Sequence, residues 1–411
     1  MTTSVGNLVR GHSLLRNRGF VLLWAAQVIS AFGDPFGTIG LSWLLYSLTG
    51  SKLAVGGLWV ALFVPQTLAR VLAGPLVDRV DRRSLMVTVD LVRAFGYLAP
   101  VALLASGHLR VWHLYAVVVI EGALGPVFQL ANMATLPTLI PTIHLVRANA
   151  LSQGTIQLAL MVGPAAAGII VAVLGAFAAL AVDALTFLAS GTALLFLRGP
   201  ASVQRSGPWL ADFREGIRFF GQHRILLWLA VLVAISNFSW QAAYVMLLPY
   251  VKDILRSSAA TFGLVTSAAS AGYAIGAWTL GLKGVLRRPR MVVIGSLGAI
   301  GLATFLIPWA RMPVTLVALM FAAGLFVPYF NIPVAAWYQQ VVPDYLRGRV
   351  FAIRMLLAHA ANPLGVAAGS ATGEFFGLTP VFIGAGLIPV VSSAIAYILP
   401  PFRELDALGR S

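Results

Sequence analysis

Apolar segments long enough to cross a bilayer recur along almost the whole chain of 411 residues. A helix needs roughly 20 apolar residues to span the hydrocarbon layer, and short polar breaks separate twelve segments of that order. The segments fall at 20–48, 54–77, 84–105, 112–137, 147–174, 176–197, 225–250, 261–282, 291–310, 314–341, 349–376 and 380–399. This pattern predicts an all-α membrane protein with twelve transmembrane helices.

The longest polar stretch lies between the sixth and seventh segments. It predicts an N-terminal six-helix half over residues 1–197, a cytoplasmic central loop over 198–224 and a C-terminal six-helix half over 225–411. Three residues of the first half recur 202 positions later: Pro126, Pro141 and Arg147 return as Pro328, Pro343 and Arg349. The common offset and the order of the spans indicate an internal duplication and therefore two pseudo-symmetric halves.

One segment of the central loop, WLADFREGIRFF (209–220), has the spacing of an amphipathic helix. Such a helix would lie on the membrane surface among the lipid headgroups. A solvated connector without regular structure fits the same residues equally well, and both alternatives stay open.

Composition indicates that the membrane is the solvent for most of the chain. Hydrophobic residues make up 59% and charged residues 10% of the sequence, whereas soluble domains carry roughly 25% charged residues. The net charge of +15 would indicate a nucleic-acid partner in a soluble protein, but the charges lie in the loops, with 20 of the 28 Lys and Arg on the N-terminal side. By the positive-inside rule both termini are cytoplasmic. We therefore expect a multi-pass protein of the bacterial cytoplasmic (inner) membrane with no nucleic-acid partner.

Sequence motifs for enzymatic or ATP-driven chemistry are absent from the chain. There is no Walker A loop, no nucleophile elbow and no H-E-x-x-H pair, and the sequence contains no Cys. No folded soluble domain of a sensor fits between the spans. The remaining class is a secondary transporter rather than an enzyme, a monomer in the lipid bilayer that uses no cofactor and no metal.

Carboxylates lie inside several predicted spans, where charge is costly and usually functional, and three of them are candidates for coupling. Asp34 is near the middle of the first span, Glu121 near the middle of the fourth and Asp183 in the outer half of the sixth. A carboxylate in a low dielectric favours its protonated form, so these residues are candidates for coupling transport to protons. On the third span, Asp90 and Arg93 are three residues apart and are expected to pair on one helix face.

A charged motif, GPLVDRVDRR (74–83), follows the second span. It resembles the G-x-L-x-D-R-x-x-R-R signature of the major facilitator superfamily, in the loop where that family carries it, and Asp81 stands where Gly is usual. The gate residues carried over are Gly74, Asp78, Arg79, Arg82 and Arg83. The resemblance implies the major facilitator fold, with Asp78 facing the positive N-terminal end of the eleventh span as a cytoplasmic latch. The alternative is a basic cluster that only sets topology.

In the superfamily fold, the first, fourth, seventh and tenth helices line a central cavity. Polar side chains at helical spacing lie on the corresponding spans here. The cavity candidates are Gln27, Gln129, Asn132, Asn237, Trp240, Gln241, Tyr244, Tyr329 and Asn331. Aromatic neighbours favour a bulky amphipathic substrate over a sugar or an ion. Hydrogen bonding between helices is the alternative role for the amides.

The fifth span contains GPAAAG (163–168), with Gly163, Pro164 and Gly168. It resembles the superfamily's Gly-Pro motif, which is associated with exporters that exchange substrate for protons, although Ala167 stands where a second Gly is common. Gly and Pro allow close packing and bending of a transmembrane helix. The fourth span has no Arg where many proton-coupled exporters of the superfamily carry one.

The stretches 15–51 and 145–153 are similar to the branch of enterobactin-type siderophore exporters and macrolide efflux proteins. This resemblance implies a multidrug-resistance type of efflux antiporter. It would export a small amphipathic molecule, such as a drug, a macrolide or a siderophore-like compound, by alternating access in exchange for protons. A branch of lysophospholipid transporters begins similarly, so a lipid flippase is the alternative function.

Overall fold

The computed structural model describes residues 14–409 except 198–217, 219, 221–222 and 285. The described residues form helices and connecting turns, and no strand occurs among them. The long helices are α2 (Arg18–Thr49), α3 (Lys52–Arg79), α4 (Arg82–Ala105), α5 (Val111–Leu139), α6 (Leu145–Leu174), α7 (Ala176–Leu195), α9 (Arg224–Pro249), α10 (Ala259–Lys283), α11 (Pro289–Phe305), α12 (Pro313–Val341), α13 (Asp344–Phe375) and α14 (Leu378–Ile398). The predicted all-α fold is confirmed, and each of the twelve predicted spans overlaps one of these helices.

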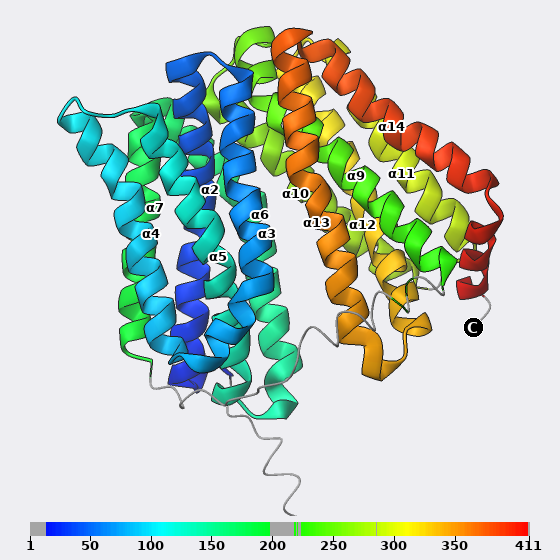
Figure 1. The fold of residues 1–411 in the computed structure, drawn as a ribbon, viewed down its shortest axis with the longest axis horizontal. Helices are drawn as coiled ribbons and strands as arrows, with labels where there is room; N and C mark the ends of the chain where they lie inside the picture. The colour runs from blue at the N-terminus through cyan, green and yellow to red at the C-terminus, as the bar shows by residue number, and fades with distance from the viewer. Residues whose placement is uncertain (1–13, 198–217, 219, 221–222, 285, 410–411) are drawn as a thin grey trace, which may run out of the picture.

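The helices form two bundles, α2–α7 and α9–α14, which stand side by side in Figure 1. Helix α2 begins and helix α14 ends at the same face of the molecule, the lower one in Figure 1. We call this the terminal face and the other the distal face. Two pairs of helices carry most of the packing between the bundles: α6 against α10 and α3 against α13.

Short polar residues set the ends of several helices. Ser51 precedes α3, and its hydroxyl accepts a hydrogen bond from the Ala54 N–H at 3.1 Å. The connection from α2 is a tight turn in which Gly50 has φ of 63°, a left-handed conformation that glycine adopts without strain. Asp81 caps α4 by accepting a hydrogen bond from the Ser84 N–H at 2.8 Å. The N-cap role gives a physical reason for an aspartate at this position.

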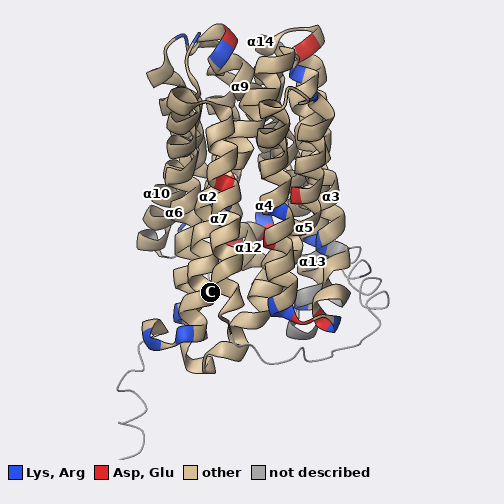
Figure 2. Cartoon of the chain, turned by 90° about the vertical axis from the view of Figure 1, so that its left-hand side faces the viewer, with Lys and Arg blue, Asp and Glu red and all other residues tan. Residues whose placement is uncertain are grey.

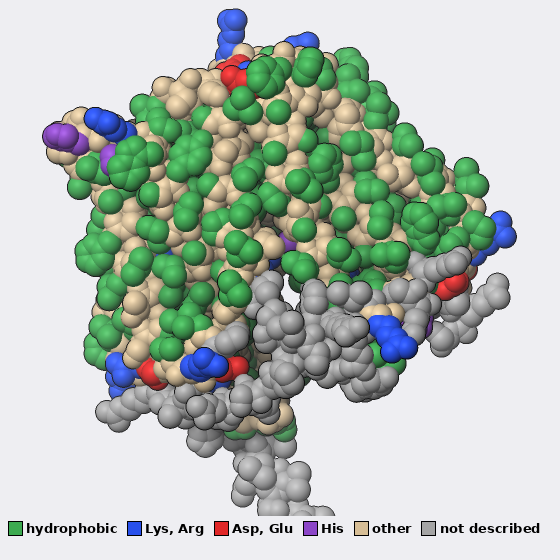
Figure 3. Space-filling view, in the orientation of Figure 1, with side chains coloured by type: hydrophobic (Ala, Val, Ile, Leu, Met, Phe, Trp, Pro, Cys, Tyr) green, Lys and Arg blue, Asp and Glu red, His purple; other side chains and the backbone are tan. Residues whose placement is uncertain are grey.

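The surface is that of a membrane protein. Ten helices in the described part of the chain are long and apolar enough to cross a bilayer. Hydrophobic side chains cover both bundles on the face shown in Figure 3, and most charged positions of the ribbon lie towards the two ends in Figure 2. The chain is therefore a multi-pass membrane protein.

Two segments outside the spans need comment. A 3-10 helix, η5 (Pro400–Gly409), follows α14 and packs on α9 and α11; the sequence pattern did not predict it. Its Phe402 and Leu405 side chains are buried, at 1% and 0% exposure. The candidate amphipathic segment 209–220 lies almost wholly outside the described residues.

Candidate functional site

A cluster of three charged side chains lies inside the N-terminal bundle. The Arg93 guanidinium of α4 donates from Nη2 to Asp34 Oδ1 of α2 at 2.9 Å. It also donates from Nε to Glu121 Oε2 of α5 at 2.7 Å and from Nη2 to Glu121 Oε1. Figure 2 shows charged positions of the ribbon at mid-depth, apart from those at the two ends. One arginine thus holds two predicted coupling carboxylates together.

The three members of this cluster differ in exposure. The side chains of Arg93 and Glu121 are 4% and 18% exposed, whereas that of Asp34 is 49% exposed. The planar guanidinium fork matches a carboxylate with two parallel hydrogen bonds, and its π face lies 3.9 Å from the centroid of the Phe187 ring. With one cation and two anions, the cluster carries a formal charge of −1 when both carboxylates are ionised.

The prediction that Asp90 pairs with Arg93 is wrong. Asp90 is fully buried and accepts a hydrogen bond from the Ser190 hydroxyl at 2.6 Å. Its other oxygen, Oδ1, has no hydrogen-bond partner among the described residues. The long arginine side chain reaches across to α2 and α5 because two carboxylates there offer a better-matched partner than one neighbour on its own helix.

Asp183 of α7 is the third predicted carboxylate, and it lies outside the ion pairs. It is fully buried, and its Oδ2 atom has no hydrogen-bond partner among the described residues. It packs against α2 where two glycines leave room: a Cβ on Gly37 would lie 2.1 Å from Asp183 Oδ2 and 2.5 Å from a ring carbon of Tyr97. Asp183 therefore occupies a separate, tightly enclosed position next to the first span.

A cavity of about 460 Å³ lies between the two bundles. Five predicted cavity residues line it: Asn237, Trp240, Gln241, Tyr244 and Asn331. The lining residues that sequence reasoning missed include Trp59, Gln157, Ser236, Ser270 and Tyr273. No Asp, Glu, Lys or Arg of the described chain lines this cavity, which is therefore formally neutral.

Aromatic rings form one wall of the cavity. Trp59 of α3 meets Tyr244 of α9 edge to face with ring centroids 5.8 Å apart, and Trp240 stacks on Tyr244 at 6.2 Å. The side-chain amide of Asn237 is partly engaged already, since its Nδ2 donates to the Ala358 carbonyl at 2.8 Å. The aromatic wall thus joins the two bundles across the cavity.

Four predicted cavity residues lie elsewhere: Gln27, Gln129, Asn132 and Tyr329 are not among the lining residues. Gln129 and Asn132 follow Glu121 by two and three helical turns, which places them nearer the terminal face. The Tyr329 hydroxyl lies 3.0 Å from the Thr279 hydroxyl, between α12 and α10. Helical spacing predicted which face of each helix these residues occupy, but it did not predict their distance along the helix from the cavity.

The charged motif at the end of α3 binds neighbouring helix ends. Asp78 pairs with Arg82 at 3.8 Å. Arg82 donates to the Ala134 carbonyl of α5 at 2.9 Å, and Arg83 donates to the Leu194 carbonyl of α7 at 3.1 Å. These arginines thus tie the last turns of α5 and α7 to the loop, where cations suit the negative helix ends. The Asp78 latch onto α13 stays a prediction.

The Gly-Pro motif of α6 lies at the contact between the bundles. Gly163 packs on Pro35 of α2, since a Cβ there would lie 2.6 Å from Pro35 Cγ. A Cβ on Gly168 would lie 2.4 Å from the Ala259 carbonyl oxygen of α10. The Ala165 N–H also donates to the Ser267 hydroxyl of α10 at 2.9 Å. The motif therefore permits the closest approach of α6 to α10.

Comparison with known proteins agrees with this architecture. The family model described as "Transmembrane secretion effector", a major facilitator family, matches residues 10–410. The chain belongs to the major facilitator superfamily. The multidrug efflux pump Tap of Mycolicibacterium fortuitum is 29% identical to it over 98% of this chain and 99% of its own length. Macrolide efflux protein A of Streptococcus pyogenes is 23% identical over 94% and 97%.

Solved structures share the fold of this superfamily member at low sequence identity. A bacterial homologue of the iron transporter ferroportin superposes with a TM-score of 0.72 at 16% identity, covering 94% of this chain and all of its own. The D323A mutant of the nucleoside transporter NupG gives 0.71 at 15% identity, covering 94% and 99%. The family and these relatives are transporters, as the sequence analysis expected.

The two halves of this major facilitator protein meet through polar contacts at the distal face. The Tyr46 hydroxyl at the end of α2 donates to Asp253, which follows α9, and Lys252 Nζ donates to the Ser47 hydroxyl at 2.8 Å. Glu374 at the end of α13 accepts a hydrogen bond from the Lys52 N–H of α3 at 2.7 Å. These contacts join the two halves at the distal face.

Proposed function

We propose that this chain is an efflux transporter that exports small amphipathic molecules by alternating access of its two halves, in exchange for protons. One observation carries the proposal: a neutral aromatic and amide cavity between the halves shares a wall with a pocket that contains Glu121 of the carboxylate–arginine cluster. Substrate and protons would then bind at neighbouring but separate places.

The cavity supports a bulky, largely uncharged substrate. Its volume of about 460 Å³ is in the range of small-molecule sites, which are mostly apolar with a few polar groups. Tryptophan and tyrosine rings offer stacking surfaces, and the amides of Gln157, Gln241 and Asn331 offer donors and acceptors. The relatives named as multidrug and macrolide efflux pumps support a drug-, macrolide- or siderophore-like cargo.

The Asp34–Arg93–Glu121 cluster supports proton exchange. Protonation of either carboxylate would weaken its attraction to Arg93, because a neutral carboxylic acid no longer pairs with the cation. The freed guanidinium would then shift towards the carboxylate that remains ionised. A change at the cluster could thereby alter the packing of α2, α4 and α5 and favour one orientation of the halves.

The orientation in the membrane is part of the proposal. Basic residues concentrate in the loops of the terminal face, so the positive-inside rule puts that face and both termini in the cytoplasm. The distal contacts of Tyr46, Lys252 and Glu374 then hold the periplasmic or outer side shut, and the cavity is reached from the cytoplasm. The transporter works as a monomer.

The test is transport by the purified chain in proteoliposomes, with a panel of labelled drugs, macrolides and a lysophospholipid, with and without a pH gradient. We expect gradient-driven movement of amphipathic drugs in the wild type. Asp34→Asn and Glu121→Gln should retain drug binding but lose at least nine-tenths of the gradient-driven transport, and Glu404→Gln on η5 is the control. Normal proton-driven rates in both cluster variants would rule out this coupling site. Gradient-independent movement of lysophospholipid alone would favour a flippase.

A further inference from the structure

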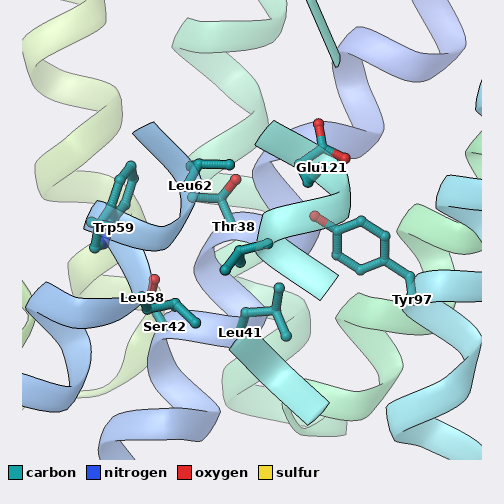
Figure 4. Close-up of a pocket in the computed structure, with 9 residues that line it drawn as sticks. Thr38, Leu41, Ser42, Leu58, Trp59, Leu62, Tyr97 and Glu121 are labelled. Carbon is teal, nitrogen blue, oxygen red and sulfur yellow. The ribbon is translucent and has the colours of Figure 1, made fainter. Parts of the chain in front are cut away.

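A small pocket of about 20 Å³ adjoins Glu121 between α2, α3, α4 and α5. Figure 4 shows its lining, with Trp59 on one side, Tyr97 on the other and Glu121 at the margin. A space of this size is large enough for one water molecule where polar groups offer it hydrogen bonds. Most of the lining is apolar, and the polar groups among the lining residues are the hydroxyls of Thr38, Ser42 and Tyr97 and the Glu121 carboxylate. We call it the Glu121 pocket.

The Glu121 pocket lies on the distal side of the charged cluster. Thr38 and Ser42 follow Asp34 along α2 by one and two turns towards the distal face, and Tyr97 follows Arg93 by one turn along α4. Helix α5 runs the other way, and its lining residue Val118 precedes Glu121. The cluster therefore has the pocket on its distal side, whereas the Asp34 side chain of the cluster is 49% exposed.

The pocket contains a hydroxyl that needs a partner. Ser42 is 2% exposed, and its Oγ atom has no hydrogen-bond partner among the described residues. A buried hydroxyl without a partner is costly, so Ser42 provides a binding site for a water molecule within the pocket. In Figure 4 the Tyr97 hydroxyl also points into the space between Thr38 and Glu121.

Trp59 separates the Glu121 pocket from the substrate cavity, because its side chain lines both spaces. The backbones around it are fixed. The Tyr115 hydroxyl of α5 donates to the Ala54 carbonyl of α3 at 2.7 Å, and a Cβ on Gly122 would lie 2.3 Å from the Leu62 carbonyl oxygen. Among the described residues, the indole contacts the rings of Phe63 and Tyr244 and packs against the neighbouring hydrophobic core. Because Tyr244 belongs to the other half, the Trp59 side chain is the part of this wall whose packing changes when the halves separate.

We propose that the Glu121 pocket is a segment of the proton path between the charged cluster and the distal face, and that Trp59 is the plug that keeps it shut while the cavity faces the terminal side. The inference rests on the proton exchange in the proposed function. When the distal side opens, Tyr244 of the other half withdraws from Trp59 and the indole turns aside. A proton then passes from a protonated water cluster to a Glu121 carboxylate oxygen, where an O–H bond forms and the water is left neutral.

The ionisable groups around Glu121 fit this one-sided access. Arg93 on α4 contacts both Asp34 on α2 and Glu121 on α5. Tyr97 on α4 lines the pocket itself. Asp90 and Asp183 are fully buried behind the cluster on α4 and α7. Only Glu121 among the carboxylates lines the pocket, so a proton entering from the distal side meets Glu121 first.

The plug is tested by proton leakage into sealed proteoliposomes without any drug, followed with an internal pH-sensitive dye. Trp59→Ala should raise the proton flux at least tenfold over wild type, and Trp59→Phe should keep the flux near the wild-type level because its ring still fills the space. Leu68→Ala is the matched control, since Leu68 lies on the exposed side of α3 and outside the lining of both spaces, and this variant should remain tight. A Trp59→Ala protein that is folded and no leakier than the wild type would overturn the proposal.

Thiol labelling gives a second measurement, because the natural chain contains no Cys. Ser42→Cys should react slowly with a small thiol reagent when Trp59 is present and at least tenfold faster when Trp59→Ala is added. Equal labelling rates with and without Trp59→Ala would contradict the role of Trp59 as a plug, even if the proton flux could not be measured. A wild-type chain that exchanges no protons for any drug would overturn the proposed function and this inference together, whereas a tight Trp59→Ala protein beside normal wild-type exchange would overturn the plug alone.

Discussion

At the scale of single residues, the sequence predicted the carboxylates of the charged cluster but not Arg93, the cation that they share. The cost of charge in hydrocarbon was enough to single out Asp34 and Glu121. Their shared cation was not identified, because local spacing favoured Asp90 as the partner of Arg93. The choice between partners depends on how α2, α4 and α5 pack, which no local pattern encodes. Trp59 was missed for the same reason, since one more aromatic residue on an apolar helix carries no distinguishing signal.

Arg93→Met should destabilise the protein strongly. It leaves Glu121, 18% exposed, without its cation, and breaking a buried ion pair from one side typically costs about 3–5 kcal/mol. Thermal unfolding in detergent measures the loss, with the exposed Arg403→Met as the control. A variant as stable as the control at neutral pH would contradict the role of the cluster in folding.

Asp81→Ala should weaken the start of α4. Hydrogen bonds from the Ser84 side chain and then from the Ser84 N–H lower the pKa of Asp81, so the ionised form stabilises the folded state. The contribution is present above the ordinary carboxyl pKa and is lost as the pH falls through the lowered folded value. At neutral pH the substitution should cost about 1 kcal/mol. Hydrogen exchange at the Ser84 amide checks this: it should accelerate in Asp81→Ala and remain slow in Asp81→Asn, and equal exchange in wild type and Asp81→Ala would refute the cap.

At the scale of helices, hydrophobic length gave nearly the whole architecture. The predicted span 54–77 became α3 (Lys52–Arg79), and 314–341 became α12 (Pro313–Val341), because the bilayer fixes helix length more strictly than propensity does. Helix η5 was missed because it is short and lies outside the apolar spans. The sequence suggested that the Gly-Pro motif allows α6 to bend and pack closely. In the structure its glycine at 168 allows α6 to pack closely against α10.

Gly168→Ala should therefore loosen the junction of the two halves. The added methyl would meet the Ala259 carbonyl oxygen at 2.4 Å, and overpacking of this kind costs about 1–3 kcal/mol. Gly154→Ala on the same helix is the matched control, since nothing lies within 4 Å of its Cβ position. We expect a lower unfolding temperature and slower transport only for Gly168→Ala. Equal behaviour of the two variants would show that close approach at Gly168 is not needed.

At the scale of the whole molecule, the two halves share a fold but differ in their functional side chains. The charged cluster belongs to the N-terminal half, whereas most of the neutral cavity wall belongs to the C-terminal half, so duplication of the fold did not duplicate the chemistry. The halves meet through Tyr46, Lys252 and Glu374 at the distal face. In the proposed alternating-access cycle these contacts are lost whenever the distal side opens, and their strength then helps to set the balance between the two orientations.

Tyr46→Phe should shift that balance towards the distally open state. The substitution keeps the ring but removes the hydrogen bond to Asp253 across the halves, and a bond to a charged group contributes about 1.5–3 kcal/mol. Since 1.4 kcal/mol is a tenfold change in an equilibrium constant, we expect at least a tenfold rise in the open population. Spin-label distances between Leu53→Cys and Arg311→Cys in the cysteine-free chain measure it directly. Tyr397→Phe, near the terminal face, should leave the distances unchanged. The same distance distribution in Tyr46→Phe as in wild type would mean that other contacts alone hold the distal side closed.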